Sequence, residues 1–245
     1  MKAVVRIALA AALVAVPASQ AMAGWRLISA KQTVTVAKSK LAVTPGEDWN
    51  RGTHRASAKG ETWTIDGPSI SEVYFAGGLQ PGETFYKDRD KKNRPLPVMG
   101  KNLQLTEVPE FYESSQRIAY DTAVYEITGI EPAKFMGQDG VKFTYTFALK
   151  DNPLKYKGEA RAAPIKGALY LISFDAPELS FYERDRAKAE AIMDSARLKA
   201  AGSAGLGTGR ALCPPRPRDR HGAEGPGLHA AAQAVTADRR LAIER

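Results

Sequence analysis

His54 is the side chain best suited to acid–base chemistry in the central part of the chain. It lies in the segment DWNRGTHRASAKGE and is the only histidine between residues 24 and 199. Asp48 or Asp66 could orient its imidazole toward a serine nucleophile. The chain has no G-x-S-x-G turn to present such a serine, and a histidine among Gly, Thr, Arg and Ser is more typical of a solvated loop. An exported hydrolase with His54 as general base is therefore the alternative hypothesis.

The segment KDRDKKNR (87–94) has the most concentrated basic charge of the central part. Such a group attracts anionic lipids, acidic polysaccharides or an acidic envelope protein. Asp88 and Asp90 alternate as calcium ligands can, but five basic residues surround them and would repel a cation. We therefore predict a basic binding loop whose contact residues are Arg89, Lys91, Lys92 and Arg94.

Other ligand-binding patterns are weak. One cysteine and three histidines, scattered along the chain, do not form a zinc site. The run GSAGLGTGR lacks the lysine and hydroxyl that follow the glycines of a phosphate-binding loop. We expect no metal and no cofactor. Trp49 and Trp63 could line a groove for a sugar or a lipid, and the simpler alternative places both in the core.

The first 23 residues have the organisation of a signal peptide. A positively charged start precedes an apolar run at 7–16, and Ala21-Met22-Ala23 matches the small-residue cleavage pattern. The apolar run is too short for a membrane span, which takes about 20 residues. We therefore predict cleavage before Gly24, a periplasmic or secreted location, and no membrane span after cleavage.

The composition changes near residue 200. All 20 aromatic residues lie between Trp25 and Tyr182, and residues 200–245 contain seven arginines but no lysine. An Ala/Gly/Pro/Arg-rich segment without large apolar side chains is predicted to be a disordered tail. A GC-rich gene read in the wrong frame gives the same composition, so a frameshift artefact is the alternative.

Net charge argues against nucleic-acid binding. The whole chain carries +8, but residues 24–199 contain 26 basic and 23 acidic residues. This is an ordinary protein surface and lacks the strongly basic footprint of a nucleic-acid-binding domain. Nucleic acid is therefore excluded as the expected partner.

Alternation of apolar and polar residues predicts a sheet in the second half of the chain. VKFTYTFALK (141–150) has the period of a strand with one buried face, and KYKGEARAA (155–163) follows after a turn. ALYLISF (168–174) is apolar throughout and predicts a central strand buried on both faces. Less regular strand patterns occur at 32–44, 61–66, 71–79 and 123–137.

Two helices are predicted. The first lies within TEVPEFYESSQRIAY (106–120), with Phe111, Tyr112 and Ser115 on one side. The second is a long C-terminal helix over 175–199. Asp175 and Glu178 have the spacing of a capping box, with Pro177 in the first turn. Its apolar stripe would consist of Leu179, Tyr182, Ala189, Ile192, Met193 and Ala196.

These elements predict an α+β fold, in which a mostly antiparallel β-sheet is packed by a mid-chain helix and a long C-terminal helix within a single domain over 24–199. KLAVTPGEDWNR resembles the opening of the PsbP-like α/β/α sandwich proteins, and LYLISFDAPELSFYERDRAKAEAIMDSARL is similar to their final strand and helix. The chain also resembles a group of uncharacterised exported proteins of alphaproteobacteria. The resemblance implies a non-catalytic binding or assembly protein and transfers no site residue.

The favoured prediction is thus an exported, soluble, non-enzymatic protein of the cell envelope that binds a small ligand or an envelope partner. The hydrolase that uses His54 is the alternative, so the sequence leaves enzymatic activity undecided. A purely structural envelope protein is a third hypothesis.

Overall fold

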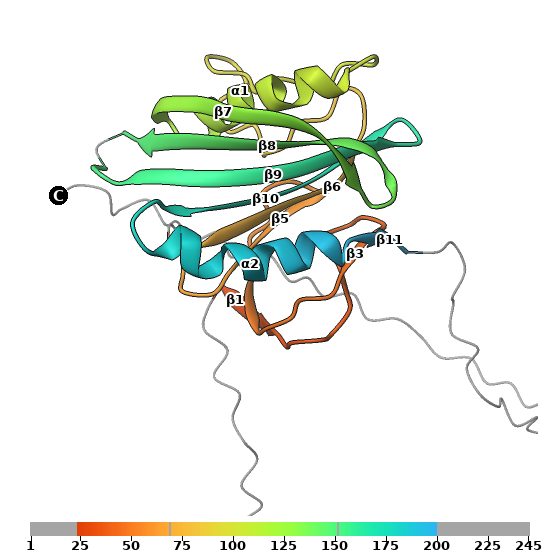
Figure 1. The fold of residues 1–245 in the computed structure, drawn as a ribbon. Coiled ribbons are helices and arrows are strands. Elements are labelled where there is room, and N and C mark those ends of the chain that lie inside the picture. Colours follow the sequence, from red (N-terminus) through yellow and green to blue (C-terminus); the bar gives the residue numbers. More distant parts are fainter. Residues whose placement is uncertain (1–23, 69, 151, 200–245) are drawn as a thin grey trace, which may run out of the picture. The chain divides into compact units, whose positions relative to one another are not determined.

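The computed structural model describes residues 24–68, 70–150 and 152–199. The predicted signal peptide (1–23) and the predicted tail (200–245) lie outside these residues. Within the described part, strands form a twisted antiparallel sheet with helices on both faces (Figure 1). This arrangement confirms the predicted α+β class.

The main sheet has eight strands in the described residues, and every neighbouring pair is antiparallel. In spatial order the strands are β1 (Trp25–Ile28), β4 (Trp49–Gly52), β5 (Gly60–Thr64), β6 (Glu72–Leu79), β10 (Ala168–Pro177), β9 (Lys155–Ile165), β8 (Gln138–Leu149) and β7 (Thr122–Phe135). A smaller sheet consists of β11 (Arg197–Leu198), β3 (Leu41–Val43) and β2 (Val34–Thr35). The single strand expected at 32–44 is therefore two short strands.

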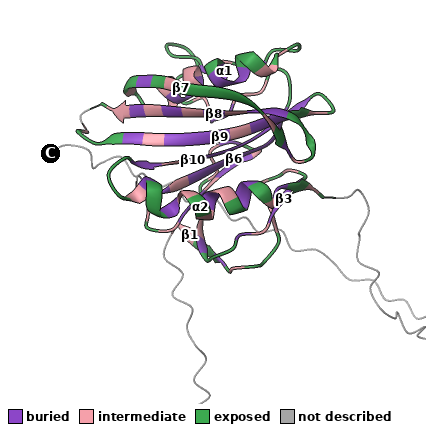
Figure 2. Cartoon of the chain, viewed as in Figure 1, coloured by how far each residue is buried: buried purple, intermediate pink, exposed green. Residues whose placement is uncertain are grey.

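The centre of the main sheet is the antiparallel pair of β6 and β10. Their register runs from Leu79 opposite Leu169 to Glu72 opposite Asp175. Side chains of a strand alternate between the two faces of a sheet, and both faces of β10 are buried, as ALYLISF predicts. Figure 2 shows this burial at the centre of the sheet, in contrast to the exposed edge strand β7.

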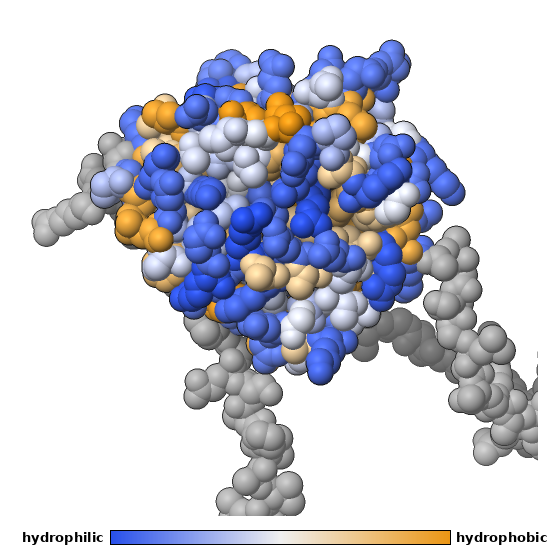
Figure 3. Space-filling view, viewed as in Figure 1, coloured by the Kyte–Doolittle hydropathy of each residue, from blue (hydrophilic) through white to orange (hydrophobic). Residues whose placement is uncertain are grey.

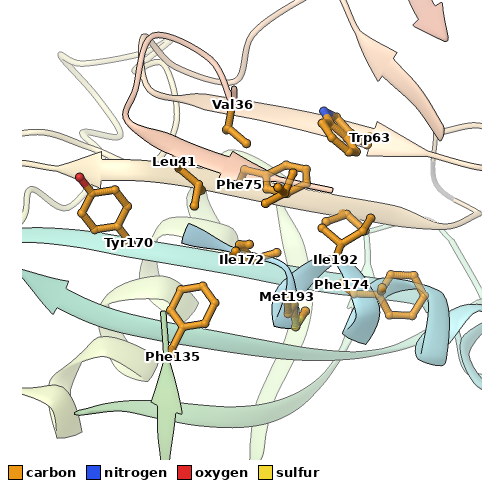
Figure 4. Packing of buried hydrophobic residues seen from close by; sticks show 14 of the residues in the cluster. Val36, Leu41, Trp63, Phe75, Phe135, Tyr170, Ile172, Phe174, Ile192 and Met193 are labelled. Atoms are coloured by element: carbon orange, nitrogen blue, oxygen red, sulfur yellow. The ribbon is translucent and has the colours of Figure 1, made fainter. Parts of the chain in front are cut away.

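One hydrophobic core lies between the sheet and the helix α2 (Phe181–Asp194). Strand β10 contributes Ile172 and Phe174 to this core, and α2 contributes Ile192 (Figure 4). The small sheet covers the same core through Leu41. Close packing of these apolar groups removes them from water and fixes α2 against the sheet.

A second core lies on the opposite face, under the helix α1 (Val108–Ala119), which follows the 3₁₀ turn η1 (Leu105–Glu107). The predicted inward residues Phe111, Tyr112 and Ser115 are buried, which confirms this helix. The alternating residues of β8 provide part of the floor, namely Val141, Phe143, Tyr145 and Phe147.

The predicted start of the C-terminal helix is wrong. Asp175 and Pro177 belong to β10, whose pairing with β9 extends to Pro177 opposite Tyr156. Burial of Ala176 in the core favours the extended chain over an early helix start. The prediction of one long helix over 175–199 is not confirmed, since α2 ends at Asp194 and Arg197–Leu198 forms β11.

The two tryptophans considered for a binding groove are core residues. Trp49 and Trp63 have no exposed surface, so the groove hypothesis is wrong. Trp63 packs on Phe75 with ring centroids 4.7 Å apart and donates a hydrogen bond from Nε1 to Glu61 Oε1 at 2.9 Å. A buried indole N–H usually has such a partner.

The surface shown in Figure 3 is mostly hydrophilic, and its hydrophobic residues form small patches. Val124 and Ile130 on β7 are among the exposed ones. Neither α1 nor α2, the helices of the described part, has the length and apolar character to cross a membrane.

Replacement of two apolar residues near α2 tests the corrected helix boundary. Ile192 is fully buried, whereas Leu179, predicted to share its stripe, is 80% exposed. We expect Ile192→Ala to lower the free energy of unfolding by about 2–5 kcal/mol. Leu179→Ala should change it by no more than about 0.5 kcal/mol. Urea denaturation measures both, and equal losses would contradict the boundary.

Candidate functional site

The predicted basic loop is part of the connection between β6 and α1, on the α1 side of the sheet (Figure 1). Its turn is closed by Asp90, whose Oδ1 accepts hydrogen bonds from Asn93 N at 3.2 Å and Asn93 Nδ2 at 2.9 Å. The carbonyl oxygen of Asp90 also accepts a bond from Arg94 N at 2.9 Å. The four predicted contact residues of this turn are all exposed: Arg89, Lys91, Lys92 and Arg94.

A cleft of about 430 Å³ opens beside this loop, and we refer to it as the lysine cleft. Lys91 lines it together with Lys59 and Lys87. Its apolar lining includes Leu79 and Leu96, which are buried, and Val98, which is 58% exposed. Both the volume and the mixture of apolar wall with a few polar groups are typical of ligand-binding clefts.

Charge in the lysine cleft is only partly balanced. Lys59 Nζ lies 2.8 Å from Glu83 Oε2 and donates to Gly78 O at 3.0 Å. Desolvation would raise the pKa of Glu83, but hydrogen bonds from Lys59 and the Gln80 backbone outweigh it, so that pKa lies below its usual value. Glu83 is therefore ionised and neutralises Lys59. Of the remaining charged lining, Lys87 and Lys91 outnumber the one acid, Asp88, so the cleft keeps a positive charge.

Two other charged side chains at the loop, Arg94 and Asp88, have defined partners. Arg94 pairs with Asp121 at 3.0 Å, so it attaches the loop to the α1–β7 connection. Asp88 Oδ2 accepts a hydrogen bond from Leu96 N at 3.2 Å. Among the described residues, Lys87 and Lys91 form no ion pair and no group of His, Cys, Asp and Glu side chains could hold a metal ion.

His54 lies in the connection between β4 and β5 and is exposed. In the described part of the chain it forms no hydrogen bond with a serine or a carboxylate. A general base must reach its nucleophile and be oriented by a third group. The geometry around His54 therefore provides no observation in favour of the hydrolase hypothesis.

Sequence reasoning missed a pair of carboxyl groups on the α1 side of the sheet. Glu72 on β6 and Asp175 on β10 are cross-strand partners, and both line a cavity of about 40 Å³. We call this the carboxyl cavity. Tyr74, Gln116 and Tyr120 form part of its wall. Neither acid was predictable as a site residue, because the sequence shows one in a strand and the other as a helix cap.

Both carboxyl groups are hard to ionise. Tyr120 Oη donates to Glu72 Oε1 at 3.4 Å, and Tyr145 Oη donates to Asp175 Oδ2 at 3.3 Å. Desolvation outweighs the first bond and raises the pKa of Glu72 from 4.5 to about 7. Desolvation and the charge of Glu72 raise the pKa of Asp175 well above its usual value. Two close carboxylates in a poorly hydrated site disfavour double ionisation.

A buried hydrogen-bond network next to the carboxyl cavity connects α1 with β10. Tyr112 Oη shares a hydrogen bond of 2.7 Å with Ser173 Oγ and accepts one of 2.5 Å from Gln116 Nε2. Burial raises the pKa of Tyr112, so its hydroxyl stays neutral. Because Gln116 is fixed by this bond, α1 holds a defined position over the cavity.

The raised pKa values predict a dependence of stability on pH. Between about pH 4.5 and 7, the folded state binds more protons at Glu72 than the unfolded state does. Stability therefore falls as the pH rises through this window. Glu72→Gln should remove the contribution of Glu72 to the slope of the free energy of unfolding against pH. It should also raise that free energy by roughly 1–3 kcal/mol above pH 7.

Denaturation by urea at a series of pH values measures this effect. Glu110→Gln, which removes an exposed carboxyl group of α1, is the matched control and should leave the slope unchanged. A slope that is the same in the protein and in Glu72→Gln would contradict the assignment.

Comparisons with known proteins found solved structures that resemble this chain but no family to which it can be assigned. No protein-family model and no curated protein sequence matches the chain. Its structure is similar to the solution structure of cyanobacterial PsbP (CyanoP) from Synechocystis sp. PCC 6803, with 14% identity over 71% of this chain and 82% of that chain and a TM-score of 0.36. It is also similar to LpqN, involved in cell envelope biogenesis of Mycobacterium tuberculosis, with 9% identity over 69% of this chain and 84% of that chain and a TM-score of 0.31.

Proposed function

We propose that this chain is an exported, non-enzymatic protein of the cell envelope that binds an anionic lipid in the lysine cleft. The observation that carries the proposal is the cleft itself. It joins Lys87 and Lys91, neither of which has an ion-pair partner among the described residues, to an apolar wall. The exposed basic loop adjoins its mouth and adds Arg89 and Lys92.

The apolar wall favours a lipid over an acidic polysaccharide. Leu79, Tyr86 and Leu96 line the cleft, and Val98 remains 58% exposed. A polysaccharide has no hydrocarbon to cover these groups, whereas a lipid has both an anionic headgroup and an apolar chain. Lysine ammonium groups near an anionic headgroup contribute about 1 kcal/mol each.

Two further features support the proposed location and class. Residues 1–23 have the pattern of a cleavable signal peptide, which supports a location in the periplasm or outside the cell. The part from residue 24 to 199 would be its folded domain, with 200–245 as a tail. Since His54 is exposed without a nucleophile or orienting acid among the described residues, binding is favoured over hydrolysis.

Charge reversal in the loop tests the proposal. Phosphatidylglycerol vesicles should bind the protein. The double variant Lys91→Glu, Lys92→Glu should lose about tenfold or more in affinity, because two charges change sign near the headgroups. Sedimentation with vesicles measures this affinity. Lys31→Glu, at an exposed lysine between β1 and β2, is the control and should bind as the unchanged protein does.

Three further arms separate the ligand classes. Phosphatidylcholine vesicles should not bind, and glycerol phosphate should bind much more weakly than the vesicles since it lacks the apolar chain. Equal vesicle binding by the double variant would refute the proposal. Binding of alginate in preference to the vesicles would replace the lipid by an acidic polysaccharide.

A further inference from the structure

Acidic side chains on the inner strands and on α2 include a fully buried group and a half-buried pair in the described part of this protein. Glu61, Glu159 and Asp185 have no exposed side-chain surface or almost none, and each lies beside a basic partner: Arg51, Arg186 and Lys188 respectively. Pairing is the usual way in which a fold retains a buried charge. Glu72 and Asp175 differ, because they are half-buried, line a cavity, and accept hydrogen bonds from tyrosines but form no ion pair within the described residues.

The described residues that line the carboxyl cavity include no lysine and no arginine. Gln116 and Tyr120, the last turn and C-cap of α1, line the carboxyl cavity, and the C-terminal end of a helix carries a partial negative charge. The other titratable groups around the pair are tyrosines of α1, β6, β8 and β9: Tyr112, Tyr74, Tyr145 and Tyr156. The cavity is therefore electrostatically complementary to a cation.

Aromatic rings complete the wall. Tyr74, Phe147 and Tyr156 line the cavity, and the last two stack with ring centroids 4.8 Å apart. Aromatic rings next to carboxylates attract organic cations through their negative faces. A metal ion such as calcium requires six to eight oxygen ligands, more than this pair and one amide supply.

We propose that the carboxyl cavity, lined by Glu72 and Asp175 beside the C-terminal end of α1, binds the ammonium group of a small primary amine. An ammonium group has three donors, which suit the two carboxylates and one further oxygen acceptor. The volume of about 40 Å³ admits such a group and little more. Tyr120 lines the cavity and is 39% exposed, so the rest of the amine would extend past this side chain to solvent.

This site differs from the lysine cleft in its charge and in its residues, so it does not depend on the proposed lipid binding. Binding at this site should also be coupled to the protonation of the two carboxyl groups. A bound ammonium group favours the ionised carboxylates, so binding near pH 7 must release a proton that the pair otherwise retains. Affinity for the amine should therefore rise between about pH 6 and pH 8.

Calorimetric titration of the purified full chain with methylammonium chloride tests the proposal. Saturable binding is expected at about pH 8, with proton release near pH 7 shown by different heats in HEPES and in cacodylate. Glu72→Gln and Asp175→Asn should each weaken binding by about tenfold or more, since each removes a charged acceptor. Both variants remove a charge that is costly to bury, so they should fold, which circular dichroism verifies. Glu110→Gln should bind as the unchanged protein does.

Tetramethylammonium, which donates no hydrogen bond and is larger, should bind at least about tenfold more weakly than methylammonium. The proposal is overturned if methylammonium does not saturate the protein, if Glu72→Gln and Asp175→Asn both bind it unchanged, or if calcium displaces it at equal concentration.

Discussion

The antiparallel pairing of β6 with β10 is the interaction on which the rest of this structure depends. It joins β1, β4 and β5 to β7, β8 and β9, two strand groups from distant parts of the sequence, into one sheet. Because the paired strands are buried on both faces, each face of the sheet needs its own apolar layer to cover it. Helix α2 and the small sheet cover one face, and α1 with the loop that precedes it covers the other.

The same pairing places the unusual polar groups of the protein. The register of β6 and β10 pairs Glu72 with Asp175, as the last pair of residues along the two strands. Elsewhere the fold places a cation beside a buried acid, as for Glu159 and Arg186 at 3.1 Å. At the carboxyl cavity, the described residues that donate hydrogen bonds to the pair are tyrosines, Tyr120 to Glu72 and Tyr145 to Asp175. An unneutralised pair weakens the folded state as the acids ionise, which suggests a role in binding rather than in stability.

The two proposed sites have opposite charge and lie in one half of the molecule. Tyr86 lines the lysine cleft, while Tyr74 and Tyr120 line the carboxyl cavity. The ring of Tyr86 packs against both, with centroids 4.9 Å from Tyr74 and 5.4 Å from Tyr120. A layer of neutral rings thus separates the lysines from the carboxyl groups, so that neither charge is cancelled by direct pairing with the other.

The sequence by itself determined the elements whose pattern is local. Alternation identified β8, a continuous apolar run identified the buried strand β10, and helical spacing identified α1 with Phe111 and Tyr112 inward. It also located the basic loop, since a run of charges is visible without a fold. Tertiary structure alone decided where β10 ends and α2 begins, because the pairing of β10 with β9 and the burial of Ala176 outweigh the helix-cap signal. It alone also formed the lysine cleft and the carboxyl cavity, because each joins side chains from separate segments whose proximity follows from strand register and packing.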